Sequence, residues 1–457
     1  MRRNGAQRRR EILAARRRAE AARRAAIARQ RAIEKAMRDE AQAFISRDDI
    51  QGEDMEVRRA AVNALGYHAG TVVVMDPMSG KIYSIVNQEW ALRRGFKPCS
   101  TIKLVTGVAG LGEKLISPYE PTSIPDKSRL DLTDALARSN NTYFQHVGGQ
   151  VGFDKMMSYA REMGLGEKTG VNAPNEYAGK LPAEKTGFAL NRMSSHGDDF
   201  EVTALQLGTM VSAMANGGKL LVPYVPRAGQ EQDQPKAKVR RKMDVSPENW
   251  RRMVPGMVGA VNYGSGRKAY DPQQTVAGKT GTCIGQGAWL GLFTSYAPLA
   301  NPRLAVVVIT RGSDARSHFP AAVAGKIYRD LNRRFGTPIH LQVATGAAAG
   351  DSKAAVLNEE EKDAAAEAAQ IEAAQIEAAE IKSLEDVDAN VAEAPDAPVN
   401  PNAAPRNTVK RVLMPIPARS TPGQKSAAPA NSSPAKTSVK PGTQPDDRER
   451  RTQPPTP

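Results

Sequence analysis

Apolar and polar positions divide the chain into a basic N-terminal stretch, a central region with strand and helix patterns, and a C-terminal region of low complexity. Two β-branched runs open the central region, and the turn Pro77-Met78-Ser79-Gly80 separates them. Three more strand-like runs lie near its end, and their short separations favour antiparallel hairpins. The five predicted strands cover residues 70–76, 81–87, 274–283, 288–296 and 304–310.

Between the two groups of strands, apolar residues recur at helical spacing. One predicted helix begins just after Pro98, and the others cover 131–138, 142–150, 153–163, 201–215, 249–261 and 320–335. We therefore expect an α+β domain over residues 69–340, in which the first and last strands complete one antiparallel sheet flanked by helices, with a helical subdomain. A domain of about 270 residues is long enough to bury a substantial core.

The N-terminal end differs from this domain in composition. Residues 1–45 are rich in Ala and Arg and predict a basic helical arm. Its apolar residues are too sparse for a core-facing stripe, so we interpret it as solvated, with binding to anionic lipid or nucleic acid as the alternative. Residues 46–68 are interpreted as a polar connector with one short helix around 55–65.

The C-terminal end changes composition again after about residue 350. Residues 355–386 predict an exposed acidic helix, because Ile371, Ile376 and Ile381 are five apart and match no coiled-coil period. Residues 387–457 are dominated by Pro, Ala, Ser and Thr and are expected to be disordered.

The formal net charge of +15 indicates an acidic partner, a membrane surface or a nucleic acid. Much of the excess lies outside any core, because residues 1–38 carry 14 Lys and Arg against three Glu. Two cysteines and five scattered histidines give neither a disulfide scaffold nor a metal constellation, and we expect no metal and no cofactor. No apolar run reaches the length of a membrane span, and no secretory signal follows the basic start.

The first candidate for catalysis is Ser100-Thr101-Ile102-Lys103, where a loop turns into an apolar helix. Residues i and i+3 share a helix face, so the Ser100 hydroxyl and the Lys103 amine are expected to point the same way. A serine becomes a nucleophile when a base removes its proton, and a desolvated lysine can act as that base. The alternative is a serine N-cap of a buried helix. A second Ser-x-x-Lys, at 433–436, lies in Pro/Ala-rich sequence and is interpreted as accidental.

A second candidate, Ser139-Asn140-Asn141, interrupts a helical pattern 39 residues after Ser100. The Ser139 hydroxyl can relay protons, and the Asn141 amide can bind a substrate amide and the lysine together. The alternative is an N-cap pair, because Ser and Asn both favour that position.

The tripeptide Lys-Thr-Gly occurs three times, at 168–170, 185–187 and 279–281. The first copy follows a predicted helix end, and the second lies in a predicted loop. Only the third copy lies in a strand-like run with another strand close behind it. The third copy is therefore the candidate.

On a strand, Lys279 can present a cation beside the hydroxyls of Thr280 and Thr282, which is what a substrate carboxylate needs. Gly281 leaves room for the backbone of a ligand to approach. The N–H groups of Thr282 and Ser100 are candidates for an oxyanion hole.

In this order the three motifs resemble the signature set of penicillin-binding proteins and serine β-lactamases. Residues 96–103 resemble the Pro-Gly-Ser-Thr-x-Lys context of penicillin-binding transpeptidases, and residues 139–144 resemble their Ser-x-Asn-x-x-Phe region. Residues 168–171 and 203–218 are similar to class B members. The resemblance covers about residues 68–335 and implies a β-lactamase/transpeptidase-like fold.

The resemblance implies a peptidoglycan D,D-transpeptidase that cross-links stem peptides through a serine acyl-enzyme. It makes Ser100 the nucleophile and Lys103 its base. It makes Ser139 the proton relay and Asn141 a positioning amide. A β-lactam is expected to acylate the same serine. The residues implied to hold the terminal carboxylate are Lys279, Thr280 and Thr282, around Gly281.

Three departures from the family pattern stand out. Cys99 occupies the place of the usual Gly, and Cys283 follows the third motif; we expect free thiols that behave as small hydrophobic residues, with a disulfide left open. The interval between Ser100 and Ser139 is short, which predicts a trimmed upper wall of the cleft. No export segment and no N-terminal pedestal domain are visible, and we therefore expect either a true start upstream or anchoring by another route.

Two other functions stay open. A serine β-lactamase needs a deacylating base, and Glu176 is a candidate by position only. A non-catalytic β-lactam sensor or scaffold is the second. The expected partners are peptidoglycan stem peptides, β-lactams, a glycan polymerase and the membrane surface, at the outer face of the cytoplasmic membrane. Nucleic acid is not expected, because no recognition module or aromatic platform is present.

Overall fold

The computed structural model describes residues 2–117, 120–125, 129–226 and 237–337, together with Lys362, Ala365, Ala366 and Ala369. These last four residues are helical and fall within the stretch predicted as an acidic helix. The rest of that stretch, the predicted disordered tail and the second Ser-x-x-Lys lie outside the described residues.

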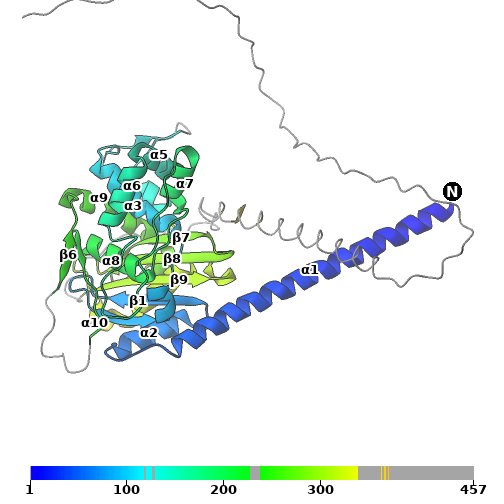
Figure 1. The fold of residues 1–457 in the computed structure, drawn as a ribbon, viewed down its shortest axis with the longest axis horizontal. Helices are drawn as coiled ribbons and strands as arrows, with labels where there is room; N and C mark the ends of the chain where they lie inside the picture. Colours follow the sequence, from blue (N-terminus) through cyan, green and yellow to red (C-terminus); the bar gives the residue numbers. More distant parts are fainter. Residues whose placement is uncertain are drawn as a thin grey trace, which may run out of the picture. The chain divides into compact units, whose positions relative to one another are not determined.

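A five-stranded antiparallel sheet in the order β2-β1-β9-β8-β7 forms the centre of the fold (Figure 1). β-branched residues dominate its middle strands, where Val73 of β1 pairs with Ile85 of β2 on one side and Val307 of β9 on the other. This pairing confirms that the first and last strands of the domain complete one antiparallel sheet. The strands are β1 (Gly70–Met75), β2 (Ile82–Val86), β7 (Ala277–Gly285), β8 (Ala288–Ala297) and β9 (Leu304–Arg311).

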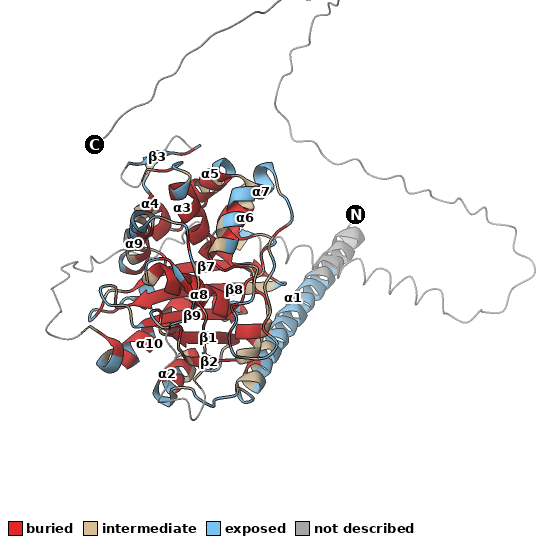
Figure 2. Ribbon diagram, turned by 60° about the vertical axis from the view of Figure 1, so that its left-hand side comes forward, coloured by how far each residue is buried: buried red, intermediate tan, exposed pale blue. Residues whose placement is uncertain are grey.

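Helices cover both faces of the sheet, so its strands are buried almost throughout (Figure 2). Successive side chains on a strand point to opposite faces. On β1, Val72 and Val74 accordingly pack in a core with α2 (Met55–Leu65) and α10 (Phe319–Phe335). Val73 packs in the other core, with residues of α3 (Lys103–Gly112) and α8 (Ala204–Ala215). The structure confirms the predicted α+β class.

The helical subdomain lies on the side of the sheet away from α2 and α10 (Figure 1). Its central helix, α3, is apolar except at Lys103 and Thr106 and is buried over nearly its whole length, as expected for a helix enclosed by others. The helices are α3 (Lys103–Gly112), α4 (Leu132–Ala137), α5 (Asn141–Val151), α6 (Phe153–Glu162), α7 (Gly187–His196), α8 (Ala204–Ala215) and α9 (Pro247–Asn262). Of these, α7 was not predicted.

Short elements complete the described part. Two small antiparallel pairs form at the margins of the fold, and four single-turn helices connect larger elements. These elements are the strand pairs β3 (Thr122–Ser123) with β4 (Arg129–Leu130) and β5 (Lys219–Leu221) with β6 (Val239–Lys242), and the helical turns η1 (Glu89–Arg93), η2 (Cys99–Ile102), η3 (Arg267–Ala269) and η4 (Ser313–Ala315).

The basic stretch forms one helix, α1 (Arg2–Ile45), whose side chains are exposed over most of the length described (Figure 2). Its last turns pack on the domain instead: Ala41 is buried, and Met37 and Phe44 pack against the core. The connector's short helix, α2, begins where the Asp54 carboxylate caps the N–H groups of Glu56 and Val57. Among the described residues, no helix is both long and apolar enough to cross a membrane.

Val307→Ala tests the sheet as the common core. Val307 is fully buried in a central strand, so removing two methyl groups is expected to lower the free energy of unfolding by about 2 kcal/mol. Val239→Ala, at a half-exposed position of β6, is the matched control and is expected to change it by less than about 0.5 kcal/mol. Urea unfolding followed by circular dichroism measures both, and equal effects of the two variants would contradict the assignment.

Candidate active site

Ser100 lies in a helical turn that leads directly into α3. The N–H of Lys103 donates to the backbone carbonyl of Ser100, so the two residues are one 3₁₀ turn apart. Side chains at i and i+3 nearly eclipse one another in this geometry. Ser100 is 2% exposed and Lys103 is fully buried, so the predicted pair shares one face in a desolvated setting.

The Lys103 ammonium is held by the junction between α4 and α5. Its Nζ donates to Ser139 O at 2.6 Å, to Ser139 Oγ at 3.0 Å and to Asn141 Oδ1 at 2.5 Å. Ser139 has a φ of 58°, in the left-handed region, which turns the chain sharply between the helices. Asn140, not Ser139 or Asn141, caps α5, because its Oδ1 accepts the N–H of Tyr143 at 2.7 Å. The N-cap alternative therefore holds for Asn140 alone.

Lys279 reaches the same junction from the sheet. Its Nζ donates to Ser139 Oγ at 2.7 Å and to the carbonyl of Thr280 at 3.0 Å. Three segments that are far apart in the sequence therefore meet at one buried hydroxyl. The two lysines and Ser139 are all fully buried.

The register of β7 explains this meeting. Residues two apart on a strand face the same way, so Lys279, Gly281 and Cys283 share the face toward the nucleophile turn. A Cβ added to Gly281 would lie 3.1 Å from Pro98 O and 3.3 Å from Cys99 Cβ. The strand and the turn are thus in direct backbone contact where only glycine fits without displacement.

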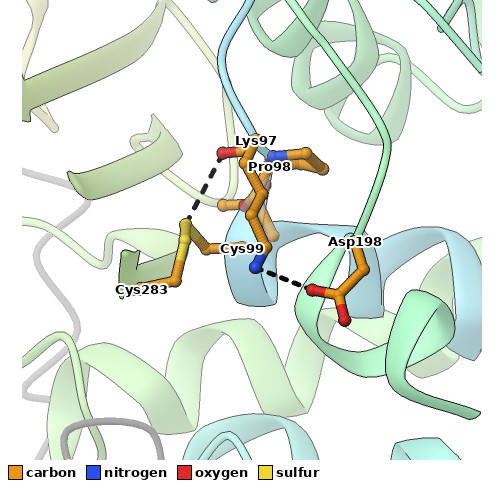
Figure 3. The surroundings of a disulfide bond; sticks show 6 residues. Lys97, Pro98, Cys99, Asp198 and Cys283 are labelled. Carbon is orange, nitrogen blue, oxygen red and sulfur yellow. Dashed lines mark hydrogen bonds and ion pairs between the residues drawn. A yellow bond between two sulfur atoms is a disulfide. The ribbon is translucent and has the colours of Figure 1, made fainter. Parts of the chain in front are cut away.

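Cys99 and Cys283 form a disulfide with a Cα–Cα distance of 5.7 Å (Figure 3). The expectation of free thiols is wrong, because the alternation that aims Lys279 at Ser139 also aims Cys283 at the nucleophile turn. Cys99 Sγ also lies 3.5 Å from Lys97 O. This is a contact rather than a hydrogen bond, since a disulfide sulfur carries no proton. The bond joins the residue before Ser100 to the strand that carries the third motif.

Thr280 and Thr282 alternate with these residues along β7 and are 1% and 4% exposed. Thr280 Oγ1 lies 2.6 Å from the hydroxyl of Ser265, in the loop after α9. Ser265 was missed, because Gly264-Ser265-Gly266 gave only the signal of a helix end. Its backbone N–H donates to Ala137 O, which ties this loop to the end of α4.

The other two Lys-Thr-Gly copies have local structural roles. Thr169 of the first copy donates through its N–H and hydroxyl to the Glu176 carboxylate, at 2.6 and 2.5 Å, and the N–H of Gly170 adds a third bond. Glu176 therefore closes its own loop, which accounts for its burial. Lys185 of the second copy pairs with Asp199, and Gly187, the last residue of that copy, begins α7.

An ion-pair cluster holds the chain just before the nucleophile turn. Lys97 Nζ lies 2.7 Å from Asp198 Oδ1 (Figure 3), and Arg192 Nε donates to Asp198 Oδ2 at 2.8 Å. Burial alone would raise the pKa of Asp198, but the bond from Arg192 and the charge of Lys97 outweigh it and lower the pKa to about 2. Asp198 is thus an anion that links α7 to the segment leading into Ser100.

Among the described residues, no group of three or more His, Cys, Asp or Glu is placed to hold a metal ion. The site consists of amines, hydroxyls and an amide around Ser100. Such groups suit proton transfer and covalent catalysis by a serine.

Residues 70–333, more than half of the chain, match a family model described as the penicillin-binding protein transpeptidase domain. Stage V sporulation protein D of Bacillus subtilis is 26% identical over 281 residues, which are 55% of this chain and 43% of that protein. Peptidoglycan D,D-transpeptidase MrdA of Acinetobacter baumannii is 25% identical over 335 residues, 56% of this chain and 50% of that protein. The chain spans about half the length of these relatives.

Solved structures give the same fold. A crystal structure of a peptidoglycan glycosyltransferase from Burkholderia ambifaria superposes with a TM-score of 0.56 at 20% identity, covering 62% of this chain and 96% of that one. The apo structure of the TP domain of Burkholderia pseudomallei penicillin-binding protein 3 superposes with a TM-score of 0.54 at 20% identity. The match covers 65% of this chain and 98% of that one. At this identity the likeness establishes the fold alone, and it confirms the predicted transpeptidase-like architecture.

Removal of the disulfide by Cys99→Ala/Cys283→Ala is expected to lower the free energy of unfolding by about 3 kcal/mol, because it releases a loop of 184 residues in the unfolded chain. Urea unfolding with and without dithiothreitol measures this effect. The free energy of unfolding of the double variant is expected to be the same with and without the reductant. Each single variant serves as a control. Its loss in the free energy of unfolding should equal that of the double variant, because either substitution removes the disulfide. Equal stability of oxidised and reduced parent, with free thiols verified by titration, would contradict the prediction.

Asp198→Asn tests the ion-pair cluster. A carboxyl whose pKa falls from 3.8 to about 2 stabilises the fold fully above pH 4, and this contribution disappears as the pH falls through 2. We expect the free energy of unfolding of the variant to be about 2 kcal/mol lower than that of the parent at pH 7. The difference from the parent should shrink between pH 4 and pH 2 in thermal melts.

The control for Asp198→Asn is Asp330→Asn, which removes an exposed ion pair with Lys326. This change is expected to cost less than about 0.5 kcal/mol at any pH. A loss in Asp198→Asn that stays constant down to pH 2 would show that charge is not the cause.

Proposed function

The chain belongs to the penicillin-binding protein transpeptidase family, and on that premise we propose that it is a peptidoglycan D,D-transpeptidase acting through an acyl-enzyme on Ser100. The observation that carries the proposal is that Lys103, one turn from Ser100, and Lys279, from β7, both donate to the Ser139 hydroxyl. The catalytic residues are Ser100, Lys103, Ser139 and Asn141. The substrate-binding residues are Lys279, Thr280, Gly281 and Thr282.

Acylation begins when Ser100 Oγ attacks the carbonyl carbon of the penultimate D-alanine and gives its proton to Lys103. The C–N bond to the terminal D-alanine then breaks, and the leaving amine receives a proton through the Ser139 hydroxyl. An amine of a second stem peptide attacks the ester, loses a proton to the same relay, and releases Ser100. Proton transfer of this kind contributes roughly 100- to 10,000-fold to the rate.

A base must be neutral before it accepts a proton. Two ammonium groups that donate to one hydroxyl repel each other in a desolvated site, so a neutral amine on one of them is favoured. Lys103 is the lysine one turn from Ser100 and is therefore the base. Lys279 keeps its charge, and Ser139 Oγ, which can both accept and donate, connects the two.

The edge strand β7 supplies the binding groups. In the described sheet β7 pairs only with β8, so its other edge has no strand partner there, and one face of the strand packs on the nucleophile turn. The charge of Lys279 and the hydroxyls of Thr280 and Thr282 suit the terminal carboxylate of a stem peptide. The N–H groups of Ser100 and Thr282 stabilise the oxyanion of the tetrahedral intermediate.

The β-lactamase alternative requires a base that deacylates the ester. The Glu176 oxygens accept three bonds from its own loop, which leaves this carboxylate with a structural role. The complete set of amines and hydroxyls argues against a non-catalytic sensor or scaffold. We therefore retain transpeptidation.

The setting proposed for this activity is the cell envelope, at the outer face of the cytoplasmic membrane. The relatives named as peptidoglycan D,D-transpeptidases support this location. The basic side chains of α1 suit an anionic membrane surface. A glycan polymerase that supplies the strands to be cross-linked is the expected protein partner, and nucleic acid is not.

Fluorescent penicillin labelling of the full chain tests the proposal. The parent is expected to form a stable covalent adduct, and Ser100→Ala none, because the acyl bond has no oxygen to form on. Lys103→Ala is expected to slow labelling by at least about 100-fold, since the serine loses its base. The measurement is in-gel fluorescence against time, with thermal melts to establish that each variant is folded.

Matched lysines provide the control for this experiment. Lys279→Ala is expected to slow labelling at least tenfold, whereas Lys168→Ala, in the first Lys-Thr-Gly copy, should label as the parent does. Labelling of Ser100→Ala at the parental rate would remove the nucleophile assignment. Release of hydrolysed antibiotic within minutes would favour the lactamase.

A further inference from the structure

Cys99 holds a backbone conformation that residues other than glycine rarely adopt. Its φ is 48°, whereas the preceding Pro98 has a φ of −68°. The N–H of Thr101 donates to the carbonyl of Pro98 at 3.1 Å, so Cys99 is the first central residue of a tight turn. Turns with a positive φ at this position favour glycine. A cysteine there is strained, and such strain persists only where the surrounding structure enforces it.

The disulfide to Cys283 supplies that constraint (Figure 3). The value of φ sets the direction of the Cα–Cβ bond relative to the turn, so a bond from the side chain to a fixed partner also fixes φ. Cys283 is such a partner, because it lies within the ladder of β7 and pairs with Leu290 of β8. Cys99 is fully buried and Cys283 is 2% exposed. The bond therefore holds Cys99 in a conformation that the turn by itself disfavours.

The consequence for catalysis lies in the next peptide bond. The N–H of Ser100 belongs to the peptide bond between Cys99 and Ser100, and it is one of the two donors proposed for the oxyanion hole. A change of the Cys99 φ to a negative value alters the path of the turn and, with it, the direction of this N–H. Such a donor stabilises the transition state only when it is aimed at the oxyanion beforehand.

The second proposed donor, the N–H of Thr282, has the same neighbour. Cys99 directly precedes Ser100, and Cys283 directly follows Thr282. The disulfide therefore joins the residues adjacent to both donors, and it fixes the distance between the turn that carries one and the strand that carries the other.

We infer that the Cys99–Cys283 disulfide sets the oxyanion hole as well as stabilising the fold: it holds Cys99 at a positive φ and thereby aims the Ser100 N–H. The inference rests on the proposed function, because the donors and the nucleophile come from it. Cys99 and Cys283 are positioning residues, since they touch no reacting atom and move no proton. Their effect lies in the rate of acylation rather than in the binding of the acyl donor.

The test compares two double variants that lack the same disulfide and differ only at residue 99. In Cys99→Ala/Cys283→Ala, the alanine relaxes toward a negative φ, and the rate constant k2 for acylation of the full chain by fluorescent penicillin is expected to fall about tenfold. In Cys99→Gly/Cys283→Ala, glycine adopts a positive φ about as readily as a negative one. Its k2 is therefore expected to recover to within about threefold of the parent.

Labelling rates at several penicillin concentrations give k2 and the Kd of the non-covalent complex separately. The Kd should be the same in the parent and both double variants, because Lys279 and Thr280 on β7 are unchanged. Thermal melts set the assay temperature below the transition of the least stable variant. Both double variants lose the same cross-link, so a general loss of stability does not predict a difference in k2 between them.

Two further variants complete the experiment. Cys283→Ala alone keeps the cysteine at position 99 without the bond, and its k2 is expected to match that of the alanine pair. Lys114→Gly is the matched control for glycine at a positive φ, because Lys114 is exposed just after α3 and has a φ of 58°. This variant should label as the parent does.

A parental k2 in the alanine pair would overturn the inference, and so would a glycine pair as slow as the alanine pair. A slower overall labelling that comes entirely from a higher Kd would overturn it too. Failure of the proposed function itself is distinct, because it appears as labelling that persists in Ser100→Ala whichever residue occupies position 99.

Discussion

The Ser139 hydroxyl accepts hydrogen bonds from two lysine side chains that arrive from different layers of the fold, Lys103 at 3.0 Å and Lys279 at 2.7 Å. All three side chains are fully buried, so the loss of any one leaves a desolvated polar group without its partner. Ser139 itself sits in a left-handed turn between α4 and α5, a conformation that the flanking helices must maintain. The positions of α3, the α4–α5 junction and β7 are consequently fixed together.

The strand β7 connects this network to the nucleophile. One of its faces presents Lys279, Gly281 and Cys283 in turn to Ser139, to the nucleophile turn and to Cys99. The close approach of Gly281 to Pro98 and the disulfide hold the nucleophile turn against the strand. The other edge of the strand has no strand partner in the described sheet.

Much of this arrangement was predictable from local patterns. β-branched runs marked the five strands because pleated, doubly buried strands favour such residues. Ser100 and Lys103 could be paired because i and i+3 share a face in any helical turn. The helix α7 was missed, because Lys185-Thr186-Gly187 and the serines that follow carry weak helix propensity and tertiary packing compensates. Ser265 was missed because its partner, Thr280, comes from another element.

The sequence by itself determined the strands, the helical turn at Ser100 and the residues able to carry serine chemistry, because these depend on neighbours within a few positions. The tertiary structure decided that Lys279 and Lys103 meet at one hydroxyl, that of Ser139, and that two cysteines 184 residues apart are joined. Each of these outcomes depends on the register of β7 and on its distance to α3. Such long-range geometry arises from the packing of whole layers, which no short stretch of residues encodes.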